Sequence, residues 1–243
     1  LSLLVDDPAN NFTPEQRTLL LKGYESNERT INLINEMLVV TRIESGKMEY
    51  DFASIHIEDL IDSVLLDFAG YVQTHHIALA FDRPTQPLPY IHADAEKIRS
   101  VLQNVIENAL YYTADGGAVT VSAAREHDFV RVSVRDNGIG IPAHQHLGIF
   151  HKFFRADNAA RIRADGSGLG LFVAKSVVDR HGGEMGFESA ENVGTTFHFT
   201  LPAVVLLAIF LAYPVFATIR LSLDTGIFLQ LQKFVGLDNY RRL

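Results

Sequence analysis

The stretch RDNGIGIP, residues 135–142, follows a run of alternating apolar residues, FVRVSV at 129–134. The alternation predicts a strand that ends at Asp136. Gly138 and Gly140 come directly after it, and glycine lets a backbone adopt positive φ and approach a flat ligand closely. A carboxylate in such a place can accept a hydrogen bond from an exocyclic amine such as that of adenine. The stretch alone is equally compatible with a simple turn, because Asp-Asn-Gly is common in turns.

The composition is that of a globular protein with one or two domains. The 243 residues are 47% hydrophobic and 21% charged, which is ordinary for a chain with a buried core. The formal net charge of −8 argues against nucleic-acid binding, which usually requires a basic face. The absence of cysteine excludes disulfides and thiolate metal sites and fits a reducing compartment. The chain begins at Leu1 without a signal-peptide pattern, so we expect it to start inside a longer protein.

A long helix is predicted near the N-terminus. Thr13 can cap it, Pro14 suits the first helical position, and Gln16 can close a capping box. The helix is expected to run to about residues 45–46. Its apolar positions follow roughly heptad spacing, which indicates packing along another helix, although a simple amphipathic core helix has the same pattern. These positions are Tyr24, Ile31, Ile34, Leu38 and Ile43.

The remaining pattern mixes helices and strands without strict βαβ alternation, which favours an α+β sandwich over a doubly wound sheet. Residues 137–167 are expected to be mostly loop. The predicted elements are a helix over 58–73, a strand over 77–81, a helix from Asp94 to about 113, a hairpin of 118–124 and 129–136, a helix within 168–183, and a hairpin of 184–190 and 195–202.

The predicted helix that begins at Asp94 carries two amide side chains, Asn104 and Asn108, with Glu107 and Tyr111 beside them. Residues four apart lie on the same face of a helix. Two amides on one stripe suit a hydrated Mg²⁺, which takes few protein ligands and keeps its waters. A polar face in contact with solvent is the alternative that this feature leaves open.

The segment DGSGLGL, residues 165–171, opens the next predicted helix. Free amides and the dipole at a helix N-terminus attract phosphate. The segment is neither a Walker loop, since no Gly-Lys-Ser/Thr is present, nor a Rossmann fingerprint, since no strand leads directly into it. Basic residues lie just before it and predict either a mobile lid over phosphates or an exposed basic loop. They are Lys152, Arg155, Arg161 and Arg163.

In this order the motifs resemble the catalytic core of the sensor histidine kinases of two-component systems, over residues 1–202. The resemblance is carried by six segments: LINEMLVVTRIESGKMEY (33–50) is similar to the end of the dimerisation hairpin, LQNVIENALYYT (102–113) to the N box, RDNGIGIP to the G1 box, IFHKFFRADNA (149–159) to the F box, DGSGLGLFVAKSVVDRHGG (165–183) to the G2 box, and ENVGTTFHFTLP (191–202) to the closing hairpin.

The resemblance implies an ATP-binding α/β sandwich over residues 49–202, in which a mixed sheet carries helices on one face. Residues 1–48 would be part of a dimerisation helical hairpin without its phosphoacceptor histidine. The implied activity is that of a protein histidine kinase, which binds Mg-ATP and passes the γ-phosphoryl group to a histidine supplied by a partner chain. The implied partners are a second copy, through a complete hairpin, and a response regulator, with no nucleic acid. The kinase domain would be cytoplasmic.

The resemblance also implies roles for single residues. Asp136 would hold the adenine amine, and Tyr112 would line the base pocket. Asn108 would bind Mg²⁺ with Asn104 beside it, while Arg155 would face the phosphates; Asn104 and Arg155 are therefore the candidates closest to the reaction. The rest of the implied nucleotide site comprises Gly138, Gly140, Lys152, Gly166, Gly168, Leu169 and Gly170.

Two departures from the family bear on activity. Tyr111 stands where the family usually has a lysine that meets the phosphates, so the charge balance is weakened unless Lys152 or an arginine substitutes. The family's His-Glu-Leu-Arg-Thr-Pro-like phosphoacceptor motif is absent and by comparison would precede Leu1. Phosphoryl transfer by this chain is therefore expected only to a partner in trans.

The tail differs from the rest of the chain. Residues 203–219, AVVLLAIFLAYPVFATI, are uncharged and predict a transmembrane helix, since about 17 apolar residues are the lower limit for a span. A buried terminal helix is the alternative. With FVGLDNYRRL (234–243), the tail 203–243 resembles the N-terminus of a sugar-type ABC transporter permease. The positive residues after the span would lie in the cytoplasm, which conflicts with a cytoplasmic kinase domain before it. A joined or mis-assembled gene is favoured over a real fusion.

Two other functions remain as alternatives. The first is an ATPase of the gyrase, MutL or Hsp90 kind, which places a glutamate four residues before the Mg²⁺-binding asparagine. Here that position is Asn104, whose amide cannot act as a general base. The second is a non-catalytic nucleotide-binding module, or a transporter piece with a decayed kinase, which Tyr111 and the tail would support.

Overall fold

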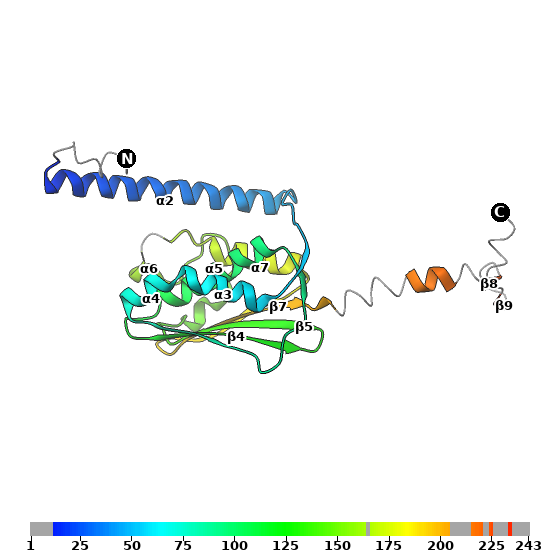
Figure 1. The fold of residues 1–243 in the computed structure, drawn as a ribbon. Helices are drawn as coiled ribbons and strands as arrows, with labels where there is room; N and C mark the ends of the chain where they lie inside the picture. The colour runs from blue at the N-terminus through cyan, green and yellow to red at the C-terminus, as the bar shows by residue number, and fades with distance from the viewer. Residues whose placement is uncertain (1–11, 164–165, 205–214, 221–223, 226–232, 235–243) are drawn as a thin grey trace.

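The computed structural model describes residues 12–163, 166–204, 215–220, 224–225 and 233–234. In these residues a layer of helices covers one face of a five-stranded sheet, and a long helix stands over that layer (Figure 1). This arrangement confirms the predicted α+β sandwich with a mixed sheet and helices on one face.

The long helix α2 spans Pro14–Glu44. Its predicted capping box is present: Thr13 Oγ1 accepts from Gln16 N–H at 3.2 Å, and Gln16 Oε1 accepts from Thr13 N–H at 2.9 Å. Only Val40 of this helix is buried. Of the apolar positions at heptad spacing, Ile31, Ile34 and Leu38 are 43%, 51% and 52% exposed, whereas Tyr24 and Ile43 are partly buried and Ile43 packs against the core. Helix α2 contacts α7 (Gly170–Arg180), so the predicted packing along another helix is made in part, and the described residues leave the middle of this face uncovered.

The main sheet has the strand order β2-β4-β5-β7-β6. The strands are β2 (Ala78–Asp82), β4 (Ala118–Glu126), β5 (Phe129–Asp136), β6 (Met185–Ala190) and β7 (Gly194–Pro202). Strands β2 and β4 run parallel, and the other pairs are antiparallel. In β5 the alternating valines point into the core, where Val132 pairs with Phe199 and Val134 with Phe197 of β7. The alternation that predicted this strand is thus the alternation of its buried face.

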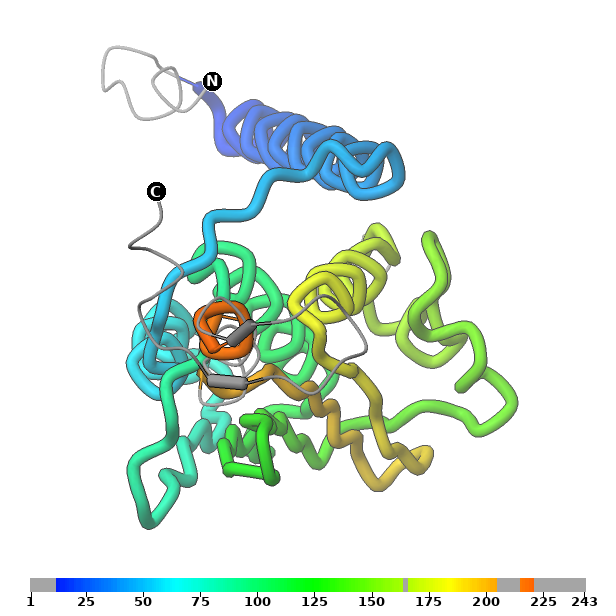
Figure 2. Tube along the Cα trace, turned by 90° about the vertical axis from the view of Figure 1, so that its right-hand side faces the viewer, coloured from blue at the N-terminus to red at the C-terminus, as the bar shows by residue number. Residues whose placement is uncertain are grey.

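The helix layer consists of α3 (Ile57–Asp67), α4 (Ala69–His75), α5 (Ala95–Tyr111) and α7 (Gly170–Arg180). Figure 2 shows α5 and α7 side by side beneath α2, with the sheet on their other side. Helix α5 begins at the predicted cap, where Asp94 Oδ1 accepts from Lys97 N–H at 3.0 Å. Its buried stripe contains Ile98, Val101, Leu102, Val105, Ile106, Ala109 and Leu110.

The helix predicted near 58–73 is helical over that range but is interrupted at Phe68, which separates α3 from α4. Phe68 ends one helix and precedes the next, with φ −94° and ψ 1°. Its ring packs against the core, and Gly70, two residues later in the first turn of α4, is a weak helix former. The chain therefore turns at Phe68 instead of continuing straight.

Short elements complete the described chain. Strands β1 (Ala53–Ile55) and β3 (Ile91–Ala93) form a small antiparallel sheet that the sequence did not predict. The segment predicted to be mostly loop contains the short helices η1 (Ala143–Gly148) and α6 (Asp157–Ile162). After β7 the backbone follows β3, since Val204 N–H donates to the Tyr90 carbonyl at 2.8 Å. Strands β8 (Asp224–Thr225) and β9 (Lys233–Phe234) pair in the tail.

The membrane-spanning helix predicted at 203–219 falls largely on residues 205–214, which lie outside the described residues. Within the part of the chain that the structure describes, none of the helices has the length and apolar character needed to cross a membrane. The permease-like resemblance of residues 203–243 also falls mainly outside the description and stays a prediction.

Candidate nucleotide site

A cavity of about 1100 Å³ lies between α2 and the helix layer of the sandwich. Three sequence motifs that are far apart in the chain meet in its wall. Asn104 and Asn108 come from α5, Asp136 from the end of β5, and Gly170 from the start of α7. The cavity also takes in Tyr112, Gly140, Arg155, Gly166 and Gly168, so most of the predicted nucleotide-site residues lie around one space.

Asp136 is almost fully buried and has one carboxylate oxygen that is already satisfied. Its Oδ1 accepts from Gly138 N–H at 2.9 Å and from Thr195 N–H at 3.1 Å. Its Oδ2 accepts no hydrogen bond from any described residue, although the carboxyl lines the cavity. Burial raises the pKa of Asp136, and the two backbone hydrogen bonds offset part of that rise. The remaining oxygen can accept a hydrogen bond from an amine on a ligand.

The two glycines after Asp136 are needed for packing on the protein's own backbone. A β-carbon at Gly138 would lie 2.2 Å from the Tyr112 carbonyl oxygen. One at Gly140, where φ is +63°, would lie 2.0 Å from the Ala190 carbonyl oxygen. Gly140 lines the cavity and Gly138 does not. These contacts, rather than close approach to a flat ligand, explain why both positions require glycine.

The side-chain amides of Asn104 and Asn108 on α5 differ in their hydrogen bonds. Asn104 Nδ2 donates to the Ser100 carbonyl at 2.9 Å, and its Oδ1 faces α7, 2.4 Å from where a β-carbon at Gly170 would lie. The side chain of Asn108 lines the cavity and makes no hydrogen bond to the described residues. Its free amide oxygen fits Mg²⁺, which takes one or two protein ligands together with waters and phosphate oxygens. Among the described residues no cluster of carboxylates and histidines offers an all-protein metal cage.

The N-terminus of α7 contributes backbone N–H groups to the same wall. Helix α7 begins at Gly170 and has no side-chain cap hydrogen bond. The first amides of a helix lack intrahelical partners and carry the positive end of its dipole, which suits a phosphate group. Leu169, which was predicted to bind nucleotide, is instead fully buried in the core and does not line the cavity. Its contribution is to anchor the start of the helix.

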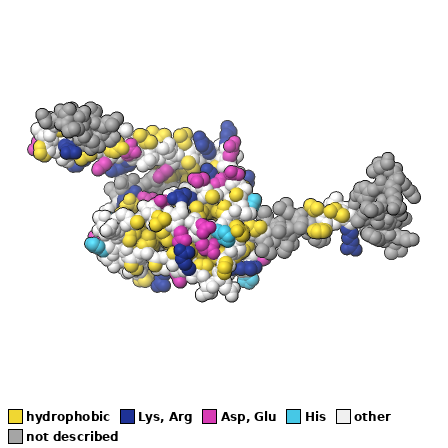
Figure 3. All heavy atoms as spheres, viewed as in Figure 1, with side chains coloured by type: hydrophobic (Ala, Val, Ile, Leu, Met, Phe, Trp, Pro, Cys, Tyr) yellow, Lys and Arg dark blue, Asp and Glu magenta, His cyan; other side chains and the backbone are white. Residues whose placement is uncertain are grey.

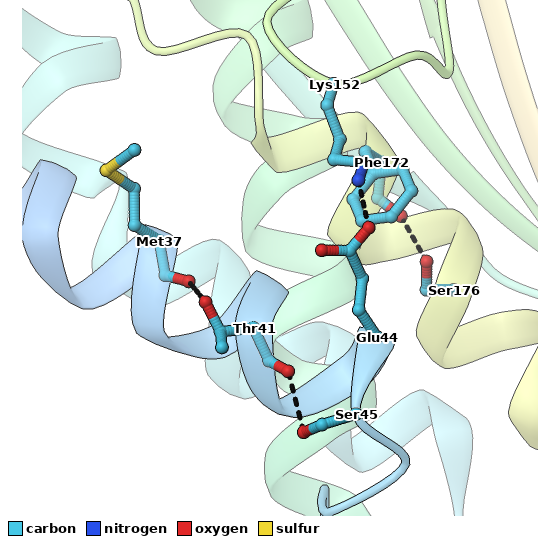
Figure 4. Close-up of polar contacts among 7 residues, drawn as sticks. All are labelled: Met37, Thr41, Glu44, Ser45, Lys152, Phe172 and Ser176. Atoms are coloured by element: carbon cyan, nitrogen blue, oxygen red, sulfur yellow. Dashed lines mark hydrogen bonds and ion pairs between the residues drawn. The ribbon is translucent and has the colours of Figure 1, made fainter.

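The basic residues before α7 separate into two groups. Arg155 and Arg163 line the cavity, and the Arg155 guanidinium donates to the Arg163 carbonyl. Lys152, predicted to serve the nucleotide, does not line the cavity. Its ammonium pairs with Glu44 at the end of α2 and lies 5.3 Å from the centroid of the Phe172 ring (Figure 4). Lys152 therefore links the long helix to the sandwich.

Sequence reasoning missed the contribution of α2 to the cavity. One side of this helix lines the space over α5 and α7, and in Figure 3 charged side chains of both signs gather along the gap between α2 and the sandwich. The sequence carries no signal for this placement, because it depends on the path of the chain between α2 and α3. The lining residues of α2 are Tyr24, Glu25, Glu28, Arg29, Asn32, Leu33, Asn35, Glu36, Met37 and Val39.

Comparisons with known proteins show which family this chain resembles. Residues 93–205 match the model of the family described as "Histidine kinase-, DNA gyrase B-, and HSP90-like ATPase". The chain is 36% identical over 204 residues to the sensor histidine kinase WalK of Bacillus subtilis (strain 168), an alignment that covers 83% of this chain and 33% of WalK. The chain thus spans less than two thirds of the length of this curated relative.

Solved structures share the fold. The crystal structure of full-length ShkA in complex with AMPPNP superposes with a TM-score of 0.69 at 28% identity, covering 80% of this chain and 40% of that chain. The histidine kinase ThkA in complex with the response regulator protein TrrA gives a TM-score of 0.59 at 25% identity, covering 82% of this chain and 53% of that chain.

Proposed function

We propose that this chain, which carries the ATP-binding catalytic domain of a protein histidine kinase, binds Mg-ATP in the cavity and transfers the γ-phosphoryl group to a histidine of a partner chain. The proposal is carried by one observation made on the described residues. A buried carboxylate with an oxygen that accepts from none of them, an amide that none of them bonds, and a helix N-terminus without a side-chain cap line the same cavity. These groups complement adenine, a hydrated cation and phosphates, respectively.

Different residues bind the adenine, the Mg²⁺ and the phosphates. Asp136 Oδ2 accepts a hydrogen bond from the adenine amine, with Tyr112 beside the base. Asn108 supplies an amide oxygen to Mg²⁺, and Asn104 stands next to it. Arg155 and the first amides of α7 face the phosphates. Full-length ShkA was crystallised with AMPPNP, an adenine nucleotide, which supports this class of ligand for the shared fold.

Catalysis in this site is mainly positioning and neutralisation of charge, since phosphoryl transfer needs little covalent chemistry from the protein. Bound Mg²⁺ supplies neutralisation of phosphate charge. The chain's own residues orient the base through Asp136, fix the phosphates at α7 and Arg155, and exclude water beneath α2. The proposed attacking group is a histidine imidazole supplied by a partner chain.

We propose two protein partners, a second copy of the chain and a response regulator. The exposed apolar face of α2 fits a complete dimerisation hairpin, and hence a homodimer. The complex of ThkA with the response regulator protein TrrA supports a response regulator as the protein that receives the phosphoryl group. We place the kinase domain in the cytoplasm, where ATP is available, and keep association with a membrane through 203–219 as part of the proposal.

A non-catalytic nucleotide-binding module is the second candidate, favoured by Tyr111 in place of the usual lysine. An ATPase fused to a transporter fragment is a weaker alternative, because Asn104 occupies the position of the water-activating glutamate.

One experiment separates these functions. The full chain is incubated with Mg²⁺ and ATP labelled on the γ-phosphate, together with a complete dimerisation hairpin that carries its histidine. We expect label on the hairpin, and its loss with Asp136→Asn. Nucleotide binding without transfer would indicate the binding module, and free labelled phosphate without labelled hairpin would indicate the ATPase. Absence of nucleotide binding would reject all three.

A further inference from the structure

Tyr111 lies in the last turn of α5 but does not line the cavity. Its ring meets the ring of Tyr71 edge-on, with centroids 5.1 Å apart and an interplanar angle of 68°. Tyr71 in turn stacks on His75, with ring centroids 4.2 Å apart. Tyr111 is therefore a fixed aromatic surface beside the cavity, held by side chains of α4.

Arg163 lies on this surface. Its guanidinium carbon is 4.1 Å from the centroid of the Tyr111 ring, within the range of a cation–π contact. Its Nη1 lies 3.6 Å from Oε1 of Glu107, which is one helical turn before Tyr111. The Arg163 carbonyl accepts from the guanidinium of Arg155. Arg163 lines the cavity, so Tyr111 holds a cation at the cavity wall without reaching the cavity itself.

The charges around the cavity require such a cation. The acidic residues that line it are Glu25, Glu28, Glu36, Glu107 and Asp136, and the basic ones are Arg29, Arg155 and Arg163. A polyphosphate therefore enters a space with more acidic than basic side chains. Of the four basic residues before α7, Lys152 and Arg161 do not line this space. Arg163 contacts Glu107 and Tyr111 of α5 and lines this space.

We infer that Arg163 contacts the phosphates of the bound nucleotide in the role of the lysine that Tyr111 replaces, with Tyr111 as the positioning residue that holds its guanidinium. The inference rests on the proposed function of the cavity. A guanidinium can stack on an aromatic ring through its face while its edge donates to phosphate oxygens, which a lysine ammonium cannot do. The phosphates carry more negative charge than the Glu107 carboxylate, and the two compete for the guanidinium N–H groups of Arg163.

The test measures binding of ATP, ADP and adenosine to the full chain by calorimetry in the presence of Mg²⁺. We expect Arg163→Gln to weaken ATP binding roughly tenfold or more, as for loss of a hydrogen bond to a charged group. Adenosine binding stays unchanged, because adenosine has no phosphates. Arg161→Gln is the matched control, since it removes an equal charge from the same segment, and it leaves ATP binding within about twofold.

Variants of Tyr111 distinguish a role in positioning the Arg163 guanidinium from a role in stabilising the fold. Tyr111→Phe keeps the ring and retains ATP affinity, whereas Tyr111→Leu weakens it, and the effects of Tyr111→Leu and Arg163→Gln are less than additive. Tyr111→Lys introduced into Arg163→Gln restores ATP affinity, which a purely structural role would not allow.

The inference fails if Arg163→Gln behaves like Arg161→Gln, or if adenosine affinity falls in parallel with ATP affinity. A wild-type chain that binds no adenine nucleotide would reject the proposed function, and the inference with it.

Discussion

Glu44, the last residue of α2, forms an ion pair with Lys152, which lies 108 positions later in the chain. Both side chains are partly exposed, at 53% and 34%, so the pair contributes little to the free energy of unfolding. Lys152 also lies over Phe172, which belongs to α7. The pair thus connects the end of α2 to the segment that follows η1 and to the helix whose N-terminus lines the cavity.

Replacement of Glu44 by Gln should loosen α2 locally without unfolding the sandwich. We expect the free energy of unfolding to change by less than about 1 kcal/mol, while backbone amides near residue 152 exchange hydrogen faster. Hydrogen exchange read by mass spectrometry measures this, with Glu15→Gln at the other end of α2 as the control. Equal exchange in the wild type and both variants would show that the pair does not restrain this segment.

Asp136→Asn should weaken ATP binding while stabilising the nucleotide-free protein. The Asn carbonyl can still accept from Gly138 and Thr195, but its amide then presents a donor to the adenine amine. We expect ATP affinity to fall at least about tenfold. Calorimetry with ATP measures the affinity, and thermal unfolding without nucleotide measures the stability. Loss of the folding transition in the variant would instead assign Asp136 a purely structural role.

The free energy of unfolding should fall with rising pH because of Asp136. Burial raises the pKa of Asp136 in the folded state above the ordinary value of about 3.9. The folded state therefore holds the proton more tightly, and stability is lost as the pH rises through the raised pKa. We expect Asp136→Asn to be more stable than the wild type at pH 7, with the difference shrinking as the pH falls through the raised pKa and vanishing below the ordinary value of about 3.9. A constant difference across pH would contradict this assignment.

Gly170→Ala should damage the site while leaving the fold intact. The new β-carbon would lie 2.4 Å from Asn104 Oδ1, so the amide must move, while alanine itself favours the helix. We expect weaker ATP binding with an unchanged far-ultraviolet circular dichroism spectrum. Gly23→Ala is the control, because a β-carbon there meets nothing within 4 Å, and it should stabilise α2 by about 0.5–1 kcal/mol. Equal ATP affinity in the two variants would argue against a role for Asn104 in the site.

Asn108→Ala should remove the dependence of ATP binding on Mg²⁺. Its amide oxygen is the proposed protein ligand of the cation, whereas the adenine contact at Asp136 does not involve it. We expect ATP affinity to be similar with and without Mg²⁺ in the variant, and higher with Mg²⁺ in the wild type. Titrations at both conditions measure this, and a Mg²⁺ effect that survives the substitution would assign the cation to other ligands.

The parts of the fold that could be predicted have a regular apolar pattern. The buried stripe of α5 and the alternation in β5 were visible because each buries one continuous face. The break at Phe68 was not, because an aromatic residue that packs on the core looks like any other apolar position in a helix. Strands β1 and β3 have three residues each, and they exist only through their pairing with each other.

Asp136 and Asn108 line the cavity as their motifs predicted, while the roles assigned to them stay predictions. Lys152 and Leu169 were misplaced because their positions depend on tertiary contacts. Lys152 turns toward Glu44 of a distant helix, and Leu169 fills the core beneath α7. The cavity wall formed by α2 was also beyond prediction, since residues 45–56 decide where that helix lies.

Strand β7 lies between β5 and β6, and it supplies the Thr195 N–H that holds the carboxylate of Asp136. During synthesis on the ribosome, every other strand of the main sheet emerges before it. The partly made chain must therefore keep the edges of β5 and β6 apart, with their hydrogen-bonding groups open, until residues 194–202 arrive. The carboxylate of Asp136, the proposed adenine contact, is also held in full only once Thr195 of this last strand is in place. Nascent chains that stop before β7 are thus those most exposed to aggregation and degradation.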